Sequence, residues 1–155
     1  LVEATEWVGP MQDLRMGFYK AAKYYYAPGW HEPGTTLEAM FNKEAYEELP
    51  KDLQTILDVA AAESNIWTLA EFDAQNGGAL EELITKHNVP VKRFPDAVMS
   101  SLRSLAEETL EEEAAKDSQA KKVHENFKKF KDQVGRWYAV SEQSYFDKIS
   151  RKYSF

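Results

Sequence analysis

Two short segments combine acidic, aromatic and turn-forming residues. They read EWVGP at 6–10 and GWHEPG at 29–34, and each places a glutamate beside a tryptophan, close to glycine and proline. Sodium and calcium prefer carboxylate and carbonyl oxygens. Tryptophan and tyrosine rings can line a small-ligand pocket and supply an occasional hydrogen-bond donor. Glu6 and Glu32 could therefore face one cavity. The alternative is that both cap turns, while Trp7 and Trp30 pack in the core.

The same segments also contain the residue types of a metal-dependent enzyme. One histidine and two carboxylates, here His31 with Glu6 and Glu32, can hold iron or zinc. His31 and Glu32 are neighbours in a loop, however, and adjacent side chains tend to diverge unless a turn gathers them. The sequence has no Gly-rich phosphate loop, no G-x-S-x-G and no H-E-x-x-H. Catalysis is therefore the second hypothesis, after binding.

The other two histidines favour structural roles. His87 precedes Asn88 at the end of a predicted helix, where a contact with the helix terminus explains it. His124 lies in the charged stretch KKVHENFKKFKD and is expected to face solvent. The charged runs are expected to form solvated helix surfaces with pairs at i,i+3 and i,i+4 spacing.

Composition limits the class of protein. The chain has 155 residues, 43% of them hydrophobic and 29% charged, which suits one ordinary globular domain. The net charge of −7, without a basic stripe, excludes nucleic acid as the expected partner. The absence of cysteine excludes zinc–thiolate sites and thiol nucleophiles. The chain opens on Leu1, directly in a strand-like segment, so a processed or truncated N-terminus is expected.

Hydrophobic spacing and turn residues predict a series of elements. In chain order these are a strand over 2–8, a short helix around Met16–Lys23, a loop over 27–34, a strand over Thr36–Phe41, a helix capped by Asn42 and ended by Pro50, a helix over 51–86 with a weak point at Gly77-Gly78, a strand over 89–94, a helix opened by Pro95, and a last helix from Val123 to Ile149.

Three long helices thus dominate, and the three short strands lack hairpin turns. Isolated short strands do not form a stable sheet. We expect the chain to be part of a larger fold.

Several motifs together resemble a known family. EW-x-GP, GFYK-x-AKYYY-x-PGWHEPG and LP-x-DLQ occur in this order, followed by FDAQNGGALEEL, VPVKRFPDAV and WYAVSEQSY. The series resembles the periplasmic solute-binding proteins of TRAP transporters, the DctP family, in their 2-oxo-acid and dicarboxylate branch. The resemblance covers essentially the whole chain.

The resemblance implies an α/β two-lobe periplasmic-binding-protein fold. Residues 1–155 would be its helix-rich C-terminal portion, without an internal domain boundary, and the 51–86 helix would span both lobes. The implied function is capture of a small organic carboxylate, a 2-oxo acid or a dicarboxylate, without catalysis. The protein would act in the periplasm and deliver its ligand to the TRAP membrane permease subunits.

The resemblance also implies roles for individual residues. Glu32 would supply a carboxylate, and Trp7 a backbone carbonyl, to a sodium or calcium ion that bridges the ligand. Five further pocket candidates are Glu6, Tyr25, Tyr26, Trp30 and His31. The family's arginine for the ligand carboxylate belongs to the segment before Leu1, and it matches none of Arg15, Arg93, Arg103, Arg136 and Arg151. Because an arginine–carboxylate pair is the strong contact in such a site, these residues alone are expected to bind ligand poorly.

Some members of this branch dimerise by exchanging their C-terminal helix. The aromatic stripe from Phe127 through Tyr145 could form such a homodimer, or it could pack on its own lobe. A purely helical interaction module is the third hypothesis, but it leaves the loop over 27–34 unexplained.

Overall fold

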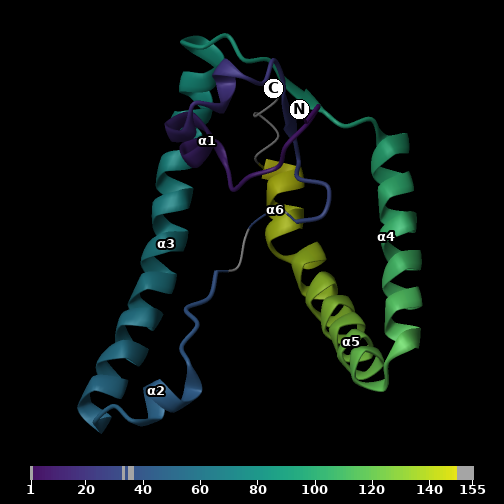
Figure 1. The fold of residues 1–155 in the computed structure, drawn as a ribbon. Coiled ribbons are helices and arrows are strands. Elements are labelled where there is room, and N and C mark those ends of the chain that lie inside the picture. The colour runs from purple at the N-terminus through teal and green to yellow at the C-terminus, as the bar shows by residue number, and fades with distance from the viewer. Residues whose placement is uncertain (1, 33, 35–36, 150–155) are drawn as a thin grey trace. The chain divides into compact units, whose positions relative to one another are not determined.

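The computed structural model describes residues 2–32, 34 and 37–149 (Figure 1). The chain forms two compact units, Leu1–Lys92 and Arg93–Phe155.

The first unit begins with a short helix that a proline starts and a glycine ends. Helix α1 covers Pro10–Met16, and Gly17 follows it in the left-handed conformation, with φ of 74°. Proline suits the first turn of a helix, and glycine adopts this conformation without steric cost. The single turn η1 (Phe18–Lys20) comes next. The predicted helix around Met16–Lys23 was therefore wrong in position, since the two breakers place the helix one turn or more earlier.

Helix α3 (Lys51–Thr85) is the longest element, as predicted, and it runs without interruption through Gly77-Gly78 (Figure 1). Beyond its end, Asn88 has φ of 54°, and the Val89 N–H donates to the Leu83 carbonyl at 3.0 Å. Leu83 is only 2% exposed. The turn therefore folds back on the most buried side chain of the described residues.

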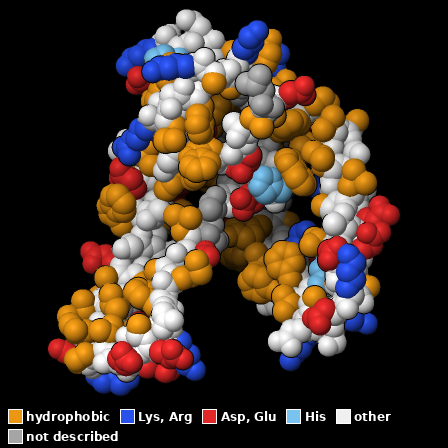
Figure 2. All heavy atoms as spheres, in the orientation of Figure 1, with side chains coloured by type: hydrophobic (Ala, Val, Ile, Leu, Met, Phe, Trp, Pro, Cys, Tyr) orange, Lys and Arg blue, Asp and Glu red, His pale blue; other side chains and the backbone are white. Residues whose placement is uncertain are grey.

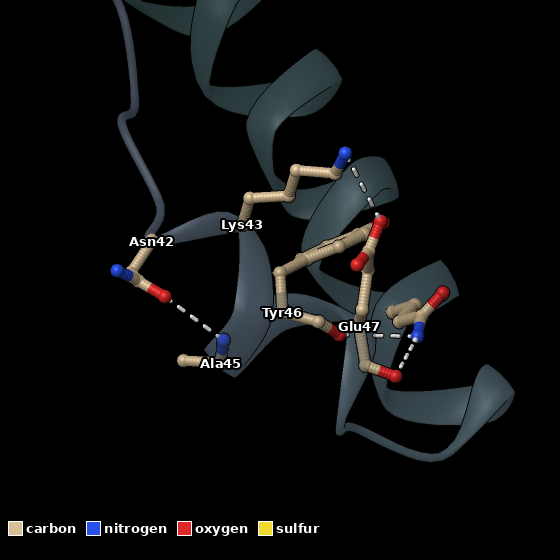
Figure 3. Close-up of polar contacts among 6 residues, drawn as sticks. Asn42, Lys43, Ala45, Tyr46 and Glu47 are labelled. Carbon is tan, nitrogen blue, oxygen red and sulfur yellow. Dashed lines mark hydrogen bonds and ion pairs between the residues drawn. The ribbon is translucent and has the colours of Figure 1, made fainter.

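The start of α3 is anchored to the short helix α2 (Lys43–Glu47), as Figure 3 shows. The Asn42 side chain accepts the Ala45 N–H at 3.0 Å, which confirms the predicted cap. The buried Gln54 amide donates to the carbonyls of Tyr46 at 3.0 Å and Leu49 at 2.9 Å. The carbonyl groups at and just beyond the end of α2 therefore find their hydrogen-bond donor in α3.

Only one of the predicted strands is found among the described residues. Strand β2 (Val91–Arg93) lies within the expected 89–94 segment and pairs with β1 (Tyr25–Ala27), which was not predicted. Residues 2–8 and 37–41 are not strands, so those two predictions were wrong, and Thr36 lies outside the described residues. A strand requires a ladder partner, and the sheet in the described part of the chain contains only β1 and β2.

The second unit is a helical hairpin followed by a short helix. Helices α4 (Asp96–Lys116) and α5 (Ser118–Val140) contact one another on either side of Asp117, whose side chain accepts the Ala120 N–H at 2.8 Å. Helix α6 (Glu142–Ile149) comes after them. The predicted last helix is broken at Ser141, whose φ of −104° and ψ of −107° are not helical.

One carboxylate ties the two helices of this hairpin together. Glu111 of α4 pairs with Lys128 of α5, and its Oε1 lies 3.3 Å from the His124 Nε2. The His124 side chain is only 14% exposed, so the expectation that it faces solvent was wrong. It lies against α4 because the two helices pack together.

Many large apolar side chains of the described residues remain exposed, and Figure 2 shows hydrophobic side chains over the α2 end of α3 and over α5. Among the described residues, no helix has the length and apolar character needed to cross a membrane.

Candidate functional site

The two segments singled out in the sequence meet in the first unit. Glu6, His31 and Glu32 each place a ligand atom so that all three atoms lie within 4.8 Å of one another. The His31 Nε2 is 3.5 Å from the Glu32 Oε1, and all three residues are exposed. Adjacent side chains were expected to diverge unless a turn gathers them, and here both neighbours reach the same point.

Gly29 makes the turn that gathers His31 and Glu32. A Cβ atom at this position would lie 2.6 Å from the Glu32 carbonyl oxygen, closer than real Cβ contacts. The backbone of Glu32 thus approaches the loop where only glycine fits. The loop directly follows β1, so the sheet fixes its first end.

Three of the aromatic residues predicted at the site are exposed. Trp7 is 52% exposed and meets Phe18 edge to face, with ring centroids 6.2 Å apart. Trp30 is 44% exposed, and its ring lies 5.0 Å from that of His31. Tyr26 is exposed as well, and its ring lies edge to face with that of Tyr24. Among the described residues, neither tryptophan is buried.

Tyr25 differs from the other predicted pocket residues because its hydroxyl is already engaged. It donates to the Asp13 Oδ2 at 2.6 Å. Burial raises the pKa of Tyr25, and the hydrogen bond to Asp13 raises it further. The described contacts thus place this hydroxyl on Asp13.

Asp13 is a buried carboxylate that the sequence reasoning missed. It is 8% exposed, and burial raises its pKa, opposed by the Tyr25 hydrogen bond and reinforced by the charge of Glu6. In sequence it resembles any acidic residue in the first turn of a helix. The signal that could have revealed it is the tyrosine cluster, because a buried tyrosine hydroxyl usually has a hydrogen-bond partner.

The cluster offers donors for a metal ion. Two carboxylates suit sodium or calcium, and the backbone carbonyl of Trp7, directly after Glu6, is the type of ligand that such ions also accept. The same carboxylates with the His31 imidazole match the donor types of iron and zinc sites.

A separate open groove of about 430 Å³ lies in the first unit. It contains none of the predicted site residues, and its lining consists of Ala39, Phe41, Lys43, Tyr46, Leu57, Asp58 and Ala61. It offers no convergent set of ligand atoms comparable with the cluster.

Two solved structures share this fold. One is a TRAP periplasmic solute-binding protein from Pseudoalteromonas atlantica T6c with bound sodium and pyruvate, 40% identical, with a TM-score of 0.88. The other is a TRAP transporter solute-binding protein from Bordetella bronchiseptica RB50 with copurified calcium and picolinate, 33% identical, with a TM-score of 0.87. Each match covers 96% of this chain and 45% of the other. Fold and site thus define a helix-rich segment of a bacterial solute-binding protein, which confirms the predicted fold class.

The chain belongs to the DctP family, bacterial extracellular solute-binding protein family 7, whose model matches residues 1–117. This confirms the family inferred from the motifs. A Nostoc sp. (strain PCC 7120) protein described as a monocarboxylate 2-oxoacid-binding periplasmic protein is 40% identical over 144 residues, which are 93% of this chain. The chain spans less than half the length of these relatives, 39% of the Nostoc protein and 45% of the two solved chains. The Nostoc and Pseudoalteromonas proteins are described as periplasmic, and the two solved relatives are described as solute-binding proteins.

Proposed function

We propose that this chain is the C-terminal portion of the extracytoplasmic solute-binding component of a TRAP transporter. It takes part in capturing a small organic carboxylate, a 2-oxo acid or a dicarboxylate, in the periplasm and delivers it to the membrane permease. The observation that carries the proposal is the convergence of ligand atoms of Glu6, His31 and Glu32, which are all exposed, within 4.8 Å of one another. The sodium with pyruvate and the calcium with picolinate in the two solved relatives support it.

In this proposal a sodium or calcium ion bridges the ligand to the protein. Glu32 supplies a carboxylate and Trp7 its backbone carbonyl, while Glu6 and His31 lie beside them. The exposed rings of Trp30 and Tyr26 form part of the ligand wall. The loop geometry supports this assignment because Gly29 holds the Glu32 backbone in a fixed turn.

Calorimetry on the complete gene product tests the proposal. Pyruvate and other 2-oxo acids, together with dicarboxylates, are titrated with sodium, with calcium and with neither ion. We expect heat with at least one carboxylate, and a lower Kd when the ion is present. The absence of heat with every small carboxylate would refute the proposal.

A metal-dependent enzyme is the second candidate, because the same three side chains match the donor set of iron or zinc. The two proposals differ in the metal that remains bound after purification. Elemental analysis that finds stoichiometric iron or zinc would favour the enzyme. Bound calcium, or a requirement for sodium in carboxylate binding, would favour the transport protein.

We also propose that the complete protein forms a homodimer through its C-terminal helices. Phe127, Phe130 and Trp137 of α5 and Tyr145 of α6 are all exposed in the second unit. The Bordetella bronchiseptica structure is described as a mixed occupancy dimer. If these helices form no dimer but bind other proteins, the helical interaction module becomes the better account.

A further inference from the structure

Asp13 and Tyr25 link the two segments that carry the cluster. Their hydrogen bond of 2.6 Å joins α1 to β1. Asp13 is more than nine-tenths buried, and its second oxygen, Oδ1, has no hydrogen-bond partner among the described residues. Burying a carboxylate is unfavourable unless it is hydrogen-bonded or paired, so the Tyr25 hydroxyl is its stabilising partner.

Each partner is firmly attached to its own element. Asp13 lies in α1, whose Met11 N–H donates to the Asn76 Oδ1 of α3 at 3.0 Å. Tyr25 opens β1, and its N–H donates to the Pro90 carbonyl at 3.1 Å. The hydrogen bond therefore joins two elements that are each anchored elsewhere in the fold, and it sets the distance between them. That distance in turn affects the segment before α1 and the loop after β1.

Those adjoining segments carry the candidate ligands. Glu6 lies seven residues before Asp13, and Glu32 lies seven residues after Tyr25. Three residues, the last of them Gly9, lie between Glu6 and α1. The turn at Gly29 brings the Glu32 backbone close to Gly29, and the Glu32 carboxylate lies within 4.8 Å of that of Glu6. The charge of Glu6 also raises the pKa of Asp13.

We propose that Asp13 and Tyr25 are positioning residues that set the separation of Glu6 and Glu32, and so control the affinity of the cluster for its cation without touching it. This inference rests on the proposed function. Groups that orient metal ligands from behind typically change metal affinity by about 10–100-fold when removed. A short hydrogen bond to a carboxylate has the strength and direction that such a role needs.

The test uses the complete gene product and calcium alone as the probe, with the Kd measured by calorimetry and the midpoint of thermal unfolding measured in parallel. Tyr25→Phe removes only the hydroxyl, and Asp13→Ala removes the acceptor. We expect each to weaken calcium binding about tenfold or more. Asp13→Asn keeps a carbonyl oxygen that accepts from the Tyr25 hydroxyl. Its calcium Kd should therefore stay within about threefold of that of the unsubstituted protein, well below the roughly tenfold loss expected when an orienting contact is removed.

The chain offers a matched control elsewhere. The Tyr46 hydroxyl donates to the Asp58 Oδ1 at 2.7 Å, a second tyrosine–aspartate bond that joins α2 to α3 away from the cluster. Tyr46→Phe therefore loses the same kind of contact, and its calcium Kd should equal that of the unsubstituted protein. If Asp13→Ala does not fold, Tyr25→Phe still decides the question because it deletes a single oxygen atom.

The outcomes are distinguishable. If Tyr25→Phe and Asp13→Ala lower the unfolding midpoint but bind calcium normally, the bond is merely structural and the inference is wrong. If Asp13→Asn is as impaired as Asp13→Ala, the charge of Asp13 matters rather than its position, and the inference is again wrong. If the unsubstituted protein does not bind calcium, the inference is wrong whatever the variants do, whereas the proposed function itself is refuted only when no small carboxylate gives heat.

Discussion

The side-chain oxygen of Asn76 in α3 accepts the main-chain N–H of Met11 in α1 at 3.0 Å, across 65 residues of sequence. The first N–H groups of a helix have no partner within the helix, so Asn76 acts as a cap supplied from another element. Gly9 precedes α1 and forms no side-chain cap of its own. Because α1 begins shortly after Glu6, this contact fixes the base of the candidate site on the longest helix.

Replacement of this asparagine should destabilise the protein. Asn76→Ala leaves the part-buried Met11 N–H without a partner, which costs about 1–3 kcal/mol. Urea unfolding of the complete gene product measures the change. Asn126→Ala is the matched control, since the Asn126 amide makes only an exposed contact with the Lys122 carbonyl. Equal stability of the two variants would contradict the role of Asn76.

Gly29 should be needed for cation binding. In Gly29→Ala the new Cβ would overlap the Glu32 carbonyl, at 2.6 Å, so the Glu32 backbone must shift. We expect calcium affinity to fall by about tenfold, the effect of displacing a metal ligand from its support. Gly34→Ala is the control, because a Cβ there meets no atom within 4 Å among the described residues. Unchanged affinity in Gly29→Ala would show that the turn does not hold the ligand.

Glu32 should be essential for the ion but not for the fold. Its side chain is exposed and pairs only with His31 among the described contacts, so its removal leaves the core intact. Glu32→Ala should abolish cation-dependent heat with 2-oxo acids while the thermal unfolding midpoint stays the same. Glu63→Ala, an exposed glutamate on α3, is the control and should bind normally. Retained ion dependence in Glu32→Ala would remove Glu32 from the site.

Local signals in the sequence predicted the elements that depend on near neighbours. The regular spacing from Leu53 onward indicated α3, the Asn42 cap indicated the start of α2, and Pro95 indicated the start of α4. Glu6, His31 and Glu32 could be selected because each lies in a distinctive motif next to turn residues, although only the fold shows that they meet.

Features that depend on contacts between distant segments could not be predicted. Asp13 acquires its role from a tyrosine twelve residues away, and β1 exists because β2 lies beside it. His124 is covered because α4 packs against α5. The alternating residues of 2–8 resemble a strand, but alternation forms a strand only when a partner is present.

The α4–α5 hairpin should lose stability in acid through Glu111. The hydrogen bond from Lys128, and then the nearby His124, whose Nε2 lies 3.3 Å from Oε1, lower the pKa of Glu111 below its ordinary value of 4.5. The folded protein therefore releases this proton at a lower pH than the unfolded chain does. The stabilisation is present above pH 4.5 and is lost as the pH falls through the lower, folded value.

Thermal unfolding monitored by circular dichroism, from about pH 6 down to about pH 3, measures the effect. Glu111→Gln should show a smaller loss of unfolding midpoint in acid than the unsubstituted protein. Glu112→Gln, the next exposed residue along α4, should keep the full loss. Because the pair is at the surface, added salt should weaken the difference. Identical acid profiles for all three proteins would show that this pair does not contribute.

The exposed aromatic stripe of the second unit should hold a dimer together. The chain leaves its helical path at Ser141, so removal of the residues after Val140 deletes α6 without cutting α5. We expect the complete gene product to sediment as a dimer, and the truncated form and Phe130→Ser to sediment as monomers, because each change removes apolar surface that the partner would bury. Ile66→Ser, a similarly exposed change on α3, is the control and should remain dimeric. A monomeric unsubstituted protein, or a dimer that survives both changes, would mean that the stripe packs within its own subunit.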